Sequence, residues 1–367
     1  MISNNRPTKT TIDLSALRAN FAAVQARVGD SVSVLAAVKA NAYGLGAIEC
    51  AHALSDAGCK HFGVATIEEG VELRQAGVKG EIISLAGVFG VAKRALEFDI
   101  SPTIFRMEDA IALNEFAKSQ NLCQRVHLKV DTGMFRIGVS LGEWSEFLRA
   151  LTQLSSLHVA GIATHFANSD DKDLDRTRLQ NERFMGALAV AKELGFSPEL
   201  IHAANSSAAM RLPDSHYNMV RAGIALYGVD PSQNYGDALS SVLTMETAII
   251  QLKKVPAGEG VSYSHTWVAP VDSTLAVLPV GYADGYKRAL SNRADVVIRG
   301  VRCPVRGNIC MDLTMVDVTD LEGSVSVGDR VELIGEVVGP HELSQHADTI
   351  PYEIFTGISL RVPRNYR

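Results

Sequence analysis

Hydrophobic and polar positions follow two alternating periods along the first two thirds of the chain. Short runs rich in β-branched residues, typical of strands, are followed by stretches with the 3.6-residue period of amphipathic helices. The predicted strands lie at residues 35–38, 62–65, 81–85, 102–105, 125–130, 159–165, 200–203 and 219–227. The helical patterns cover residues 47–57, 67–76, 91–98, 107–119, 141–154 and 174–194. This alternation predicts parallel βαβ units.

Eight such strands in one series predict an α/β fold, a closed (β/α)₈ TIM barrel in residues 1–238. An open, doubly wound sheet is the alternative that the pattern leaves open. A further strand pattern at residues 10–14 cannot belong to a closed eight-stranded barrel. We therefore expect residues of about 8–14 to form a strand of a second domain.

The pattern changes near Leu239. From there helical periods nearly vanish, and short strand patterns are separated by turns containing Gly, Pro and Asp. This predicts a C-terminal, mostly-β domain that covers residues 239–367.

Composition narrows the class of protein. A net charge of -6 argues against nucleic acid or an anionic membrane as the main partner. No run approaches the roughly 20 apolar residues of a membrane span, and the polar residues 1–7 lack the apolar core of a signal peptide. The five cysteines are scattered, and no pair has the spacing of zinc ligands. We expect a cytoplasmic protein with reduced thiols and no metal site.

One lysine stands out. The apolar residues 34–38 deliver Lys39 to the end of a strand pattern, and small residues and glycines follow it. An apolar setting lowers the pKa of a lysine from roughly 10.4 towards neutrality. A partly neutral lysine is a nucleophile for aldehydes and a carrier of protons. The run alone does not distinguish this function from a lysine that merely extends to solvent.

Polar residues recur at the carboxyl ends of the predicted strands, where barrel enzymes form their active sites. A single strand-end histidine is more often structural, but this recurrence favours a site. Hydroxyls and backbone amides of small residues in 205–207 and 221–224 suit a phosphate. A reactive lysine, a phosphate site and the flat ring of His165 together indicate pyridoxal 5′-phosphate.

The chain resembles the alanine racemase family of barrel-type pyridoxal-phosphate enzymes from about residue 11 to residue 364. The shared motifs are AVKANAYG (37–44), KVDTGM (129–134), THFA (164–167), NSS (205–207), RAGIALYG (221–228), VSY (261–263), GYADGY (281–286), CMD (310–312) and YEI (352–354). The resemblance implies an isomerase that interconverts L- and D-alanine and supplies D-alanine for peptidoglycan. It also implies a homodimer with shared active sites, in which the β domain contributes to the partner's site.

The resemblance also assigns roles to residues. Lys39 would hold the cofactor and act as one base, and Tyr263 would be the other base on the opposite face of the substrate. A free tyrosine has a pKa of about 10 and is a poor base near neutral pH. Tyr263 therefore needs a neighbour that favours its phenolate form, and His165 linked to Arg221 resembles that neighbour in the family. Arg136 and Met311 would bind the substrate carboxylate, and Lys129 matches a lysine that is carbamylated in relatives. The remaining matched cofactor contacts are Tyr43, Asn205, Ser206, Gly223, Ile224 and Tyr352.

Arg221 would face the pyridine nitrogen, where many other enzymes of this cofactor carry an aspartate. A guanidinium cannot accept a proton there at neutral pH, so the ring would withdraw fewer electrons. One departure concerns the entrance corridor, because Asn308 stands where many relatives have an arginine.

Several alternatives remain. A serine or broad-specificity racemase would differ only in pocket width. A decarboxylase of related fold would carry a glutamate at position 221 and a Cys-Asp dyad that we do not find. A non-catalytic pyridoxal-phosphate-binding protein would be a single barrel without the β domain.

Overall fold

The computed structural model describes residues 6–232 and 239–367. The chain forms two compact units, and each is described by itself. The first consists of residues 17–42 and 46–240, and the second of residues 1–16, 43–45 and 241–367. The predicted domain boundary at residue 238 falls within residues 233–238, which lie outside the described part of the chain. Residues 1–5 of the polar N-terminal segment also lie outside it.

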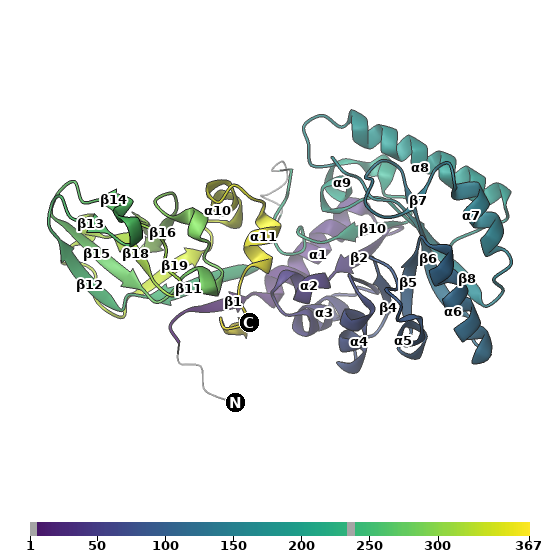
Figure 1. Ribbon diagram of the computed structural model, residues 1–367, viewed down its shortest axis with the longest axis horizontal. Coiled ribbons are helices and arrows are strands. Elements are labelled where there is room, and N and C mark those ends of the chain that lie inside the picture. Colours follow the sequence, from purple (N-terminus) through teal and green to yellow (C-terminus); the bar gives the residue numbers. More distant parts are fainter. Residues whose placement is uncertain (1–5, 233–238) are drawn as a thin grey trace. The chain divides into compact units, whose positions relative to one another are not determined.

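The first unit contains a closed barrel of parallel strands (Figure 1). Its strands are β2 (Ser33–Ala37), β3 (His61–Val64), β4 (Glu81–Ser84), β5 (Ile100–Ile104), β6 (Gln124–Asp131), β8 (Leu157–Ala163), β9 (Leu200–His202) and β10 (Met219–Ala222). The barrel closes where β10 pairs with β2, with Val220 opposite Val34. The predicted barrel is therefore confirmed, and the open sheet is wrong. Strand β10 ends before the turn that begins at Gly223, earlier than predicted.

Parallel barrel strands are buried on both faces, which explains why they appear in the sequence as short continuous apolar runs. Leu35, Ile83 and Met219 pack together in the core and are fully buried. The covering helices are α3 (Ala47–Asp56), α4 (Ile67–Gln75), α5 (Ala92–Glu97), α6 (Met107–Ser119), α7 (Trp144–Leu151), α8 (Asp175–Glu193) and α9 (Ser206–Arg211).

The helix α1 (Leu14–Val28) was not predicted. Its buried residues include Leu17, Phe21 and Val24, which have helical spacing, but the buried polar Asn20 interrupts the apolar stripe. The Asn20 side chain donates to the carbonyl oxygens of Leu226 (3.0 Å) and Ser240 (2.8 Å). The helix is thus tied to the segment that follows β10.

The second unit is mostly β and contains a six-stranded sheet in the order β17-β16-β19-β11-β1-β20. These strands are β1 (Lys9–Ile12), β11 (Leu243–Ala248), β16 (Asp295–Ile298), β17 (Val301–Pro304), β19 (Arg330–Ile334) and β20 (Arg364–Tyr366). The early strand β1 runs antiparallel to β11 and parallel to β20.

Smaller sheets and two helices complete this unit. A three-stranded sheet joins β12 (Gln251–Val255), β15 (Ser273–Leu278) and β18 (Thr314–Asp317), and β13 (Gly260–Val261) pairs with β14 (Trp267–Val268). The short helices α10 (Pro340–His346) and α11 (Pro351–Thr356) were not predicted, and each begins with a proline at its first position.

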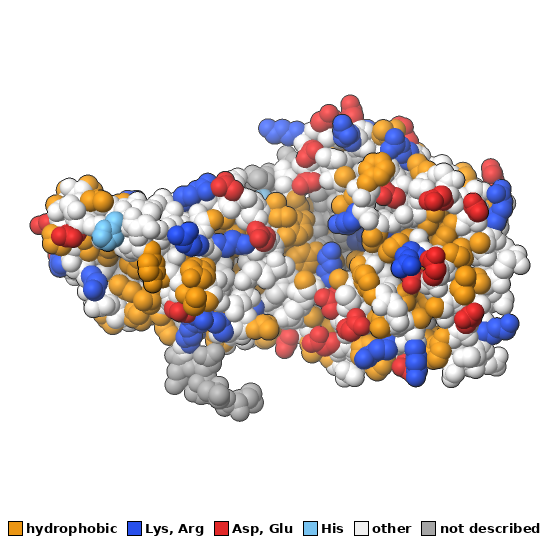
Figure 2. All heavy atoms as spheres, in the orientation of Figure 1, with side chains coloured by type: hydrophobic (Ala, Val, Ile, Leu, Met, Phe, Trp, Pro, Cys, Tyr) orange, Lys and Arg blue, Asp and Glu red, His pale blue; other side chains and the backbone are white. Residues whose placement is uncertain are grey.

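The described helices include none with the length and apolar character that crossing a bilayer would require. On the face of the barrel unit that Figure 2 shows, Lys and Arg side chains are interspersed with Asp and Glu.

Candidate functional site

The segment after β2 places Lys39 at the carboxyl end of the barrel and then enters an unusual turn. Ala40, Asn41, Ala42 and Tyr43 all have left-handed backbones, with φ between 51° and 57°. Left-handed conformations cost L-residues roughly 1–2 kcal/mol each. Such strain concentrates at functional sites, where the surrounding structure maintains it.

The guanidinium of Arg221, in β10, is buried and held by five hydrogen bonds. Nη1 donates to Nδ1 and the carbonyl oxygen of His202, both at 2.9 Å. Nη2 donates to His165 Nδ1 (2.9 Å) and to the carbonyl oxygens of Thr164 (2.8 Å) and Ala203 (2.9 Å). Burial lowers the pKa of Arg221 to about 10, assisted by Arg136, so the group remains a cation at neutral pH.

The bond from Arg221 determines the tautomer of His165. Because a guanidinium has no acceptor atom, His165 Nδ1 must accept, and the ring proton of the neutral imidazole lies on Nε2. Burial, followed by the charges of Arg221 and Lys129, holds the pKa of His165 well below its ordinary value. His165 is therefore a neutral donor through Nε2–H.

A second series of polar groups, which was not predicted, starts at the Nη1 atom of Arg221. His202 Nδ1 also accepts from Arg221, so its Nε2–H donates to His127 Nδ1 at 2.9 Å. His127 Nε2 then lies 3.5 Å from Glu81 Oε1, which also accepts from Ser101 at 2.8 Å. Both histidines are buried. The carboxylate of Glu81 therefore lies at the far end of this series of polar groups, with two imidazoles between it and the buried guanidinium.

We expect Glu81→Gln to destabilise the barrel at pH 7 by about 2 kcal/mol, the magnitude of a hydrogen bond to a charged group. Burial opposes ionisation of Glu81, but donors on His127 and His61 outweigh it and hold the pKa of this carboxyl well below its usual range. A lowered folded-state pKa stabilises the protein above the unfolded value of about 4.3, and the benefit is lost as the pH falls below it. Urea unfolding between pH 7 and pH 3 should show the difference shrinking below about pH 4.

Glu199→Gln is the matched control, because Glu199 bonds to Arg125, as Glu81 does, but is half exposed. Exposed ion pairs contribute about 0–1 kcal/mol. A Glu81→Gln effect no larger than that of Glu199→Gln, or one independent of pH, would contradict a buried charge network.

Two lysines at this end of the barrel have lowered pKa values. Burial, together with the charges of Arg136 and Arg221, lowers the pKa of Lys39, while Glu69 opposes the shift. Burial and the same two arginines lower the pKa of Lys129 to about 7. The structure therefore brings Lys39, Lys129, Arg136 and Arg221 within electrostatic reach of one another.

This collection of cations suits anionic ligands. An aldehyde cofactor that carries a phosphate and a phenolic oxygen, bound beside a substrate carboxylate, would supply the negative charge that the cluster lacks. The residues present therefore fit pyridoxal 5′-phosphate.

The predicted phosphate contacts after β9 and β10 lie together. Ser206 Oγ accepts from the backbone N–H of Gly223 at 2.9 Å and of Ala225 at 3.3 Å. With both lone pairs engaged, the Ser206 hydroxyl proton is free to donate to a phosphate oxygen. Asn205 instead caps α9, because its Oδ1 accepts from Ala208 N at 3.1 Å. The predicted contact Ile224 is buried in the turn after Gly223.

In the second unit, the rings of Tyr43 and Tyr352 lie side by side, with centroids 5.9 Å apart. Burial raises the pKa of Tyr43, so its hydroxyl stays protonated and can donate. Two of the predicted cofactor contacts, far apart in sequence, are therefore neighbours.

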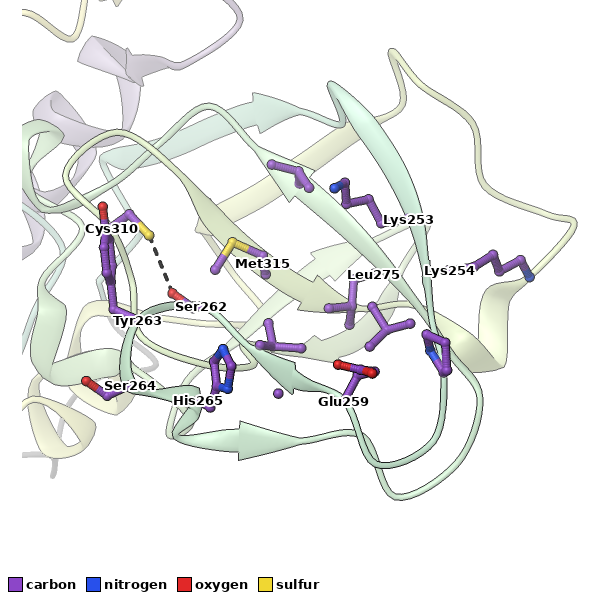
Figure 3. A pocket seen from close by; sticks show the side chains of 15 residues that line it. Lys253, Lys254, Glu259, Ser262, Tyr263, Ser264, His265, Leu275, Cys310 and Met315 are labelled. Atoms are coloured by element: carbon purple, nitrogen blue, oxygen red, sulfur yellow. Dashed lines mark hydrogen bonds between the residues drawn. The ribbon is translucent and has the colours of Figure 1, made fainter.

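Tyr263 stands on a strained turn at one edge of a groove of about 870 Å³ (Figure 3). Ser262, Ser264 and His265 have positive φ angles, and the Tyr263 side chain is 71% exposed. The groove is lined by this turn, by Cys310 and by residues of β12 and β15. A groove beside an exposed aromatic side chain is typical of a surface that another molecule covers.

Asn308 lies directly behind this turn. Its Nδ2 donates to the Tyr263 carbonyl oxygen at 2.7 Å, and its own carbonyl accepts from Ser262 Oγ at 2.5 Å. Asn308 thus supports the backbone that carries Tyr263, while its expected effect on the entrance corridor stays a prediction. Met311 is 53% exposed, and its carbonyl oxygen accepts from Ala283 N.

Comparisons with known families match almost the whole chain. A family model described as the alanine racemase N-terminal domain matches residues 12–231, and one described as the alanine racemase C-terminal domain matches residues 242–366. The alanine racemase of Halothermothrix orenii is 43% identical over 369 residues, covering 99% of this chain and 97% of the relative.

Solved structures are similar along the same length. The alanine racemase of Streptomyces coelicolor A3(2) superimposes with a TM-score of 0.96 at 34% identity, covering 100% of this chain and 99% of that one. The alanine racemase of Bartonella henselae, determined with covalently bound pyridoxal phosphate, has a TM-score of 0.91 at 33% identity, covering 98% and 99%.

Proposed function

The chain belongs to the alanine racemase family and interconverts L- and D-alanine with pyridoxal 5′-phosphate, and we propose that Lys39 and Tyr263 are its two bases. Inverting the α carbon requires a proton to leave one face and another to arrive on the opposite face. The observation that carries the proposal is the bond from Arg221 Nη2 to His165 Nδ1. It makes His165 a neutral Nε2–H donor, which can stabilise a tyrosinate.

Lys39 would hold the cofactor and then move a proton at Nζ on one face of the substrate. When bound, the cofactor supplies the electron-withdrawing ring that makes the α proton acidic. Burial and the neighbouring arginines already shift Lys39 towards its neutral form, which is the form that accepts a proton. Tyr263 Oη would take or give the proton on the other face, with His165 Nε2–H as its partner.

Arg221 would face the pyridine nitrogen as a donor that cannot take a proton. Its five hydrogen bonds hold the guanidinium rigidly, and because all five acceptors are neutral, its positive charge stays in place. A ring nitrogen left unprotonated withdraws fewer electrons. We infer that this arrangement favours reprotonation at the α carbon over side reactions.

The remaining residues would bind the anionic groups. Tyr43, Ser206, Gly223, Ile224 and Tyr352 would surround the phosphate, with Asn205 supporting this region as the cap of α9. Arg136 and the backbone N–H of Met311 would bind the substrate carboxylate. Lys129, with a pKa of about 7, has the neutral amine that reaction with carbon dioxide needs, and carbamylation would make it an anionic partner of Arg136.

We also propose a cytoplasmic homodimer with shared sites, whose product serves peptidoglycan synthesis. The exposed Tyr263 and Met311 support sharing, because residues with proposed roles at the substrate need a second surface to form a closed site when they lie on an open one. On the barrel unit, Phe135 is 89% exposed beside Arg136, which suits a buried position in an interface. All five cysteine thiols are free, as a reducing compartment permits.

Mixing two inactive variants tests this function and the sharing together. Lys39→Ala and Tyr263→Phe subunits, allowed to exchange, should form heterodimers in which one site combines both defects and the other has neither. Statistical exchange of equal amounts makes half of the dimers mixed. We therefore expect about a quarter of wild-type alanine racemisation to return, since each mixed dimer has one intact site of two.

Matched tags on the two variants verify subunit exchange by mass. No recovery despite proven exchange would contradict shared sites. An intact site that racemises L-serine as fast as L-alanine would instead favour the broad-specificity alternative.

A further inference from the structure

The carboxylate of Glu69 bridges the ends of two barrel strands. Its Oε1 accepts from the backbone N–H of Ala40 at 2.8 Å, and its Oε2 accepts from that of Ala65 at 2.7 Å. Ala40 directly follows Lys39, and Ala65 directly follows β3. One side chain therefore fixes the first residue of the left-handed turn to the neighbouring strand end.

Glu69 is itself held in place. It lies in the first turn of α4, where the N-cap residue Thr66 accepts from the Glu69 backbone N–H through its hydroxyl at 3.4 Å. A threonine followed three residues later by a glutamate is the sequence pattern of a capping box, in which the glutamate returns to the N–H of the cap residue. Here the carboxylate is directed to Ala65 and Ala40 instead. Glu69 therefore binds the segment after Lys39 and the end of β3 rather than the N–H of its own helix cap.

The turn has its own supports at its far end. Ala42 N donates to the Val38 carbonyl oxygen at 2.8 Å, and Asn41 Oδ1 accepts from Ala47 N at 2.8 Å. These bonds are local, within the segment from residue 38 to residue 47. The residue before Lys39 is tied to β3, because Val38 N donates to the Gly63 carbonyl oxygen at 2.8 Å. The bond from Ala40 to Glu69 ties the residue after Lys39 to α4.

We infer that Glu69 is a positioning residue of the racemase, whose carboxylate fixes the strained turn after Lys39 and thereby holds Lys39 Nζ at the reacting carbon. This inference rests on the proposed role of Lys39 as a base. The Glu69 charge also raises the pKa of Lys39 against the burial and the two arginines that lower it. Losing the charge would therefore shift the protonation of the base as well as its position.

Glu69→Gln tests the inference in the complete, cofactor-loaded enzyme. A glutamine can accept one backbone N–H, but its amide nitrogen would face the other N–H, so one of the two bonds is lost. We expect amide hydrogen exchange in residues 40–46 to accelerate at least tenfold. The kcat for alanine should fall about ten- to hundredfold while KM changes little, as expected when a reacting group is misplaced.

Two variants provide controls. Glu68→Gln removes an exposed carboxylate from the same helical turn and should leave both exchange and kcat within twofold of wild type. Glu69→Asp keeps the charge but is too short to reach both amides, so it should accelerate exchange while disturbing the pH profile of kcat less than Glu69→Gln.

Wild-type exchange rates in both Glu69→Gln and Glu69→Asp would overturn the inference, as would a loss of activity expressed only in KM. Should Glu69→Gln fail to fold, Glu69→Asp alone decides through its exchange rates. Failure of the proposed function is recognised separately, because the cofactor of the wild-type enzyme would then be attached to a lysine other than Lys39.

Discussion

Replacing Lys39 by alanine is expected to reduce alanine racemisation by at least about 10³-fold, because the variant would lose both the proposed proton-transfer group and the proposed attachment of the cofactor. Borohydride treatment of the wild-type enzyme should fix the cofactor permanently to Lys39, and peptide mass spectrometry should find the added mass there. The same treatment of Lys39→Ala should leave the chain unlabelled.

Lys129 is the stringent comparison. It lies at the same end of the barrel, and its pKa of about 7 gives it a substantial neutral fraction. Lys129→Ala should retain the borohydride label on Lys39. A label on Lys129 in the wild-type enzyme would show that the assignment of the cofactor lysine is wrong.

Replacing Tyr263 by phenylalanine should remove proton transfer on one face of the substrate only, with a loss of about 10²–10⁴-fold on that face. Overall racemisation must fall equally in both directions, because the enantiomers have equal free energies in water. The distinguishing measurement is therefore exchange without inversion. We assign Tyr263 to proton removal from L-alanine and Lys39 to proton removal from D-alanine. Deuterium at the α carbon of D-alanine should then still wash out into water through Lys39, whereas deuterium in L-alanine should be retained.

Tyr217→Phe is a suitable control, since it also removes a phenolic hydroxyl, which there donates to Asn181 at 2.7 Å. It should leave wash-out from both enantiomers unchanged. Equal and mild losses for both enantiomers in Tyr263→Phe would contradict the two-base scheme.

The barrel could be predicted because strands buried on both faces produce apolar runs that are visible in the sequence. Burial on both faces also makes the series of polar groups from Arg221 through His202 and His127 to Glu81 impossible to recognise in the sequence. With both faces buried, nothing in the sequence tells which way His127 points, or that it lies opposite Gly161 in the pairing of β6 with β8. A Cβ on Gly161 would lie 2.1 Å from His127 Nδ1, so this glycine makes room for the ring. Predicting this contact would require the pairing register of β6 and β8, which is shifted between Val126 and His127.

The candidate site also contains residues that could be predicted from the sequence and residues that could not. Lys39 and the strand-end residues His165, Asn205 and Arg221 were candidates on their positions alone, because strand ends converge in a barrel. Tyr263 was a candidate only through the resemblance, since a tyrosine on an exposed turn has no periodic signal. Glu69 was missed because a glutamate three residues after a threonine at a helix start is usually part of a capping box. Only its two hydrogen bonds distinguish it.

The pairing of β1 with β11 and β20 bears on the order in which the molecule can assemble during translation. Ile12 pairs with Leu243, which the ribosome adds more than two hundred residues later. At a synthesis rate of about 5–20 residues per second, β1 remains without its first partner strand for roughly ten to fifty seconds. The intervening residues contain every strand of the barrel, so the barrel can close while β1 is still unpaired. A nascent chain arrested after the barrel would therefore expose a strand edge, which makes the last third of the chain a safeguard against aggregation.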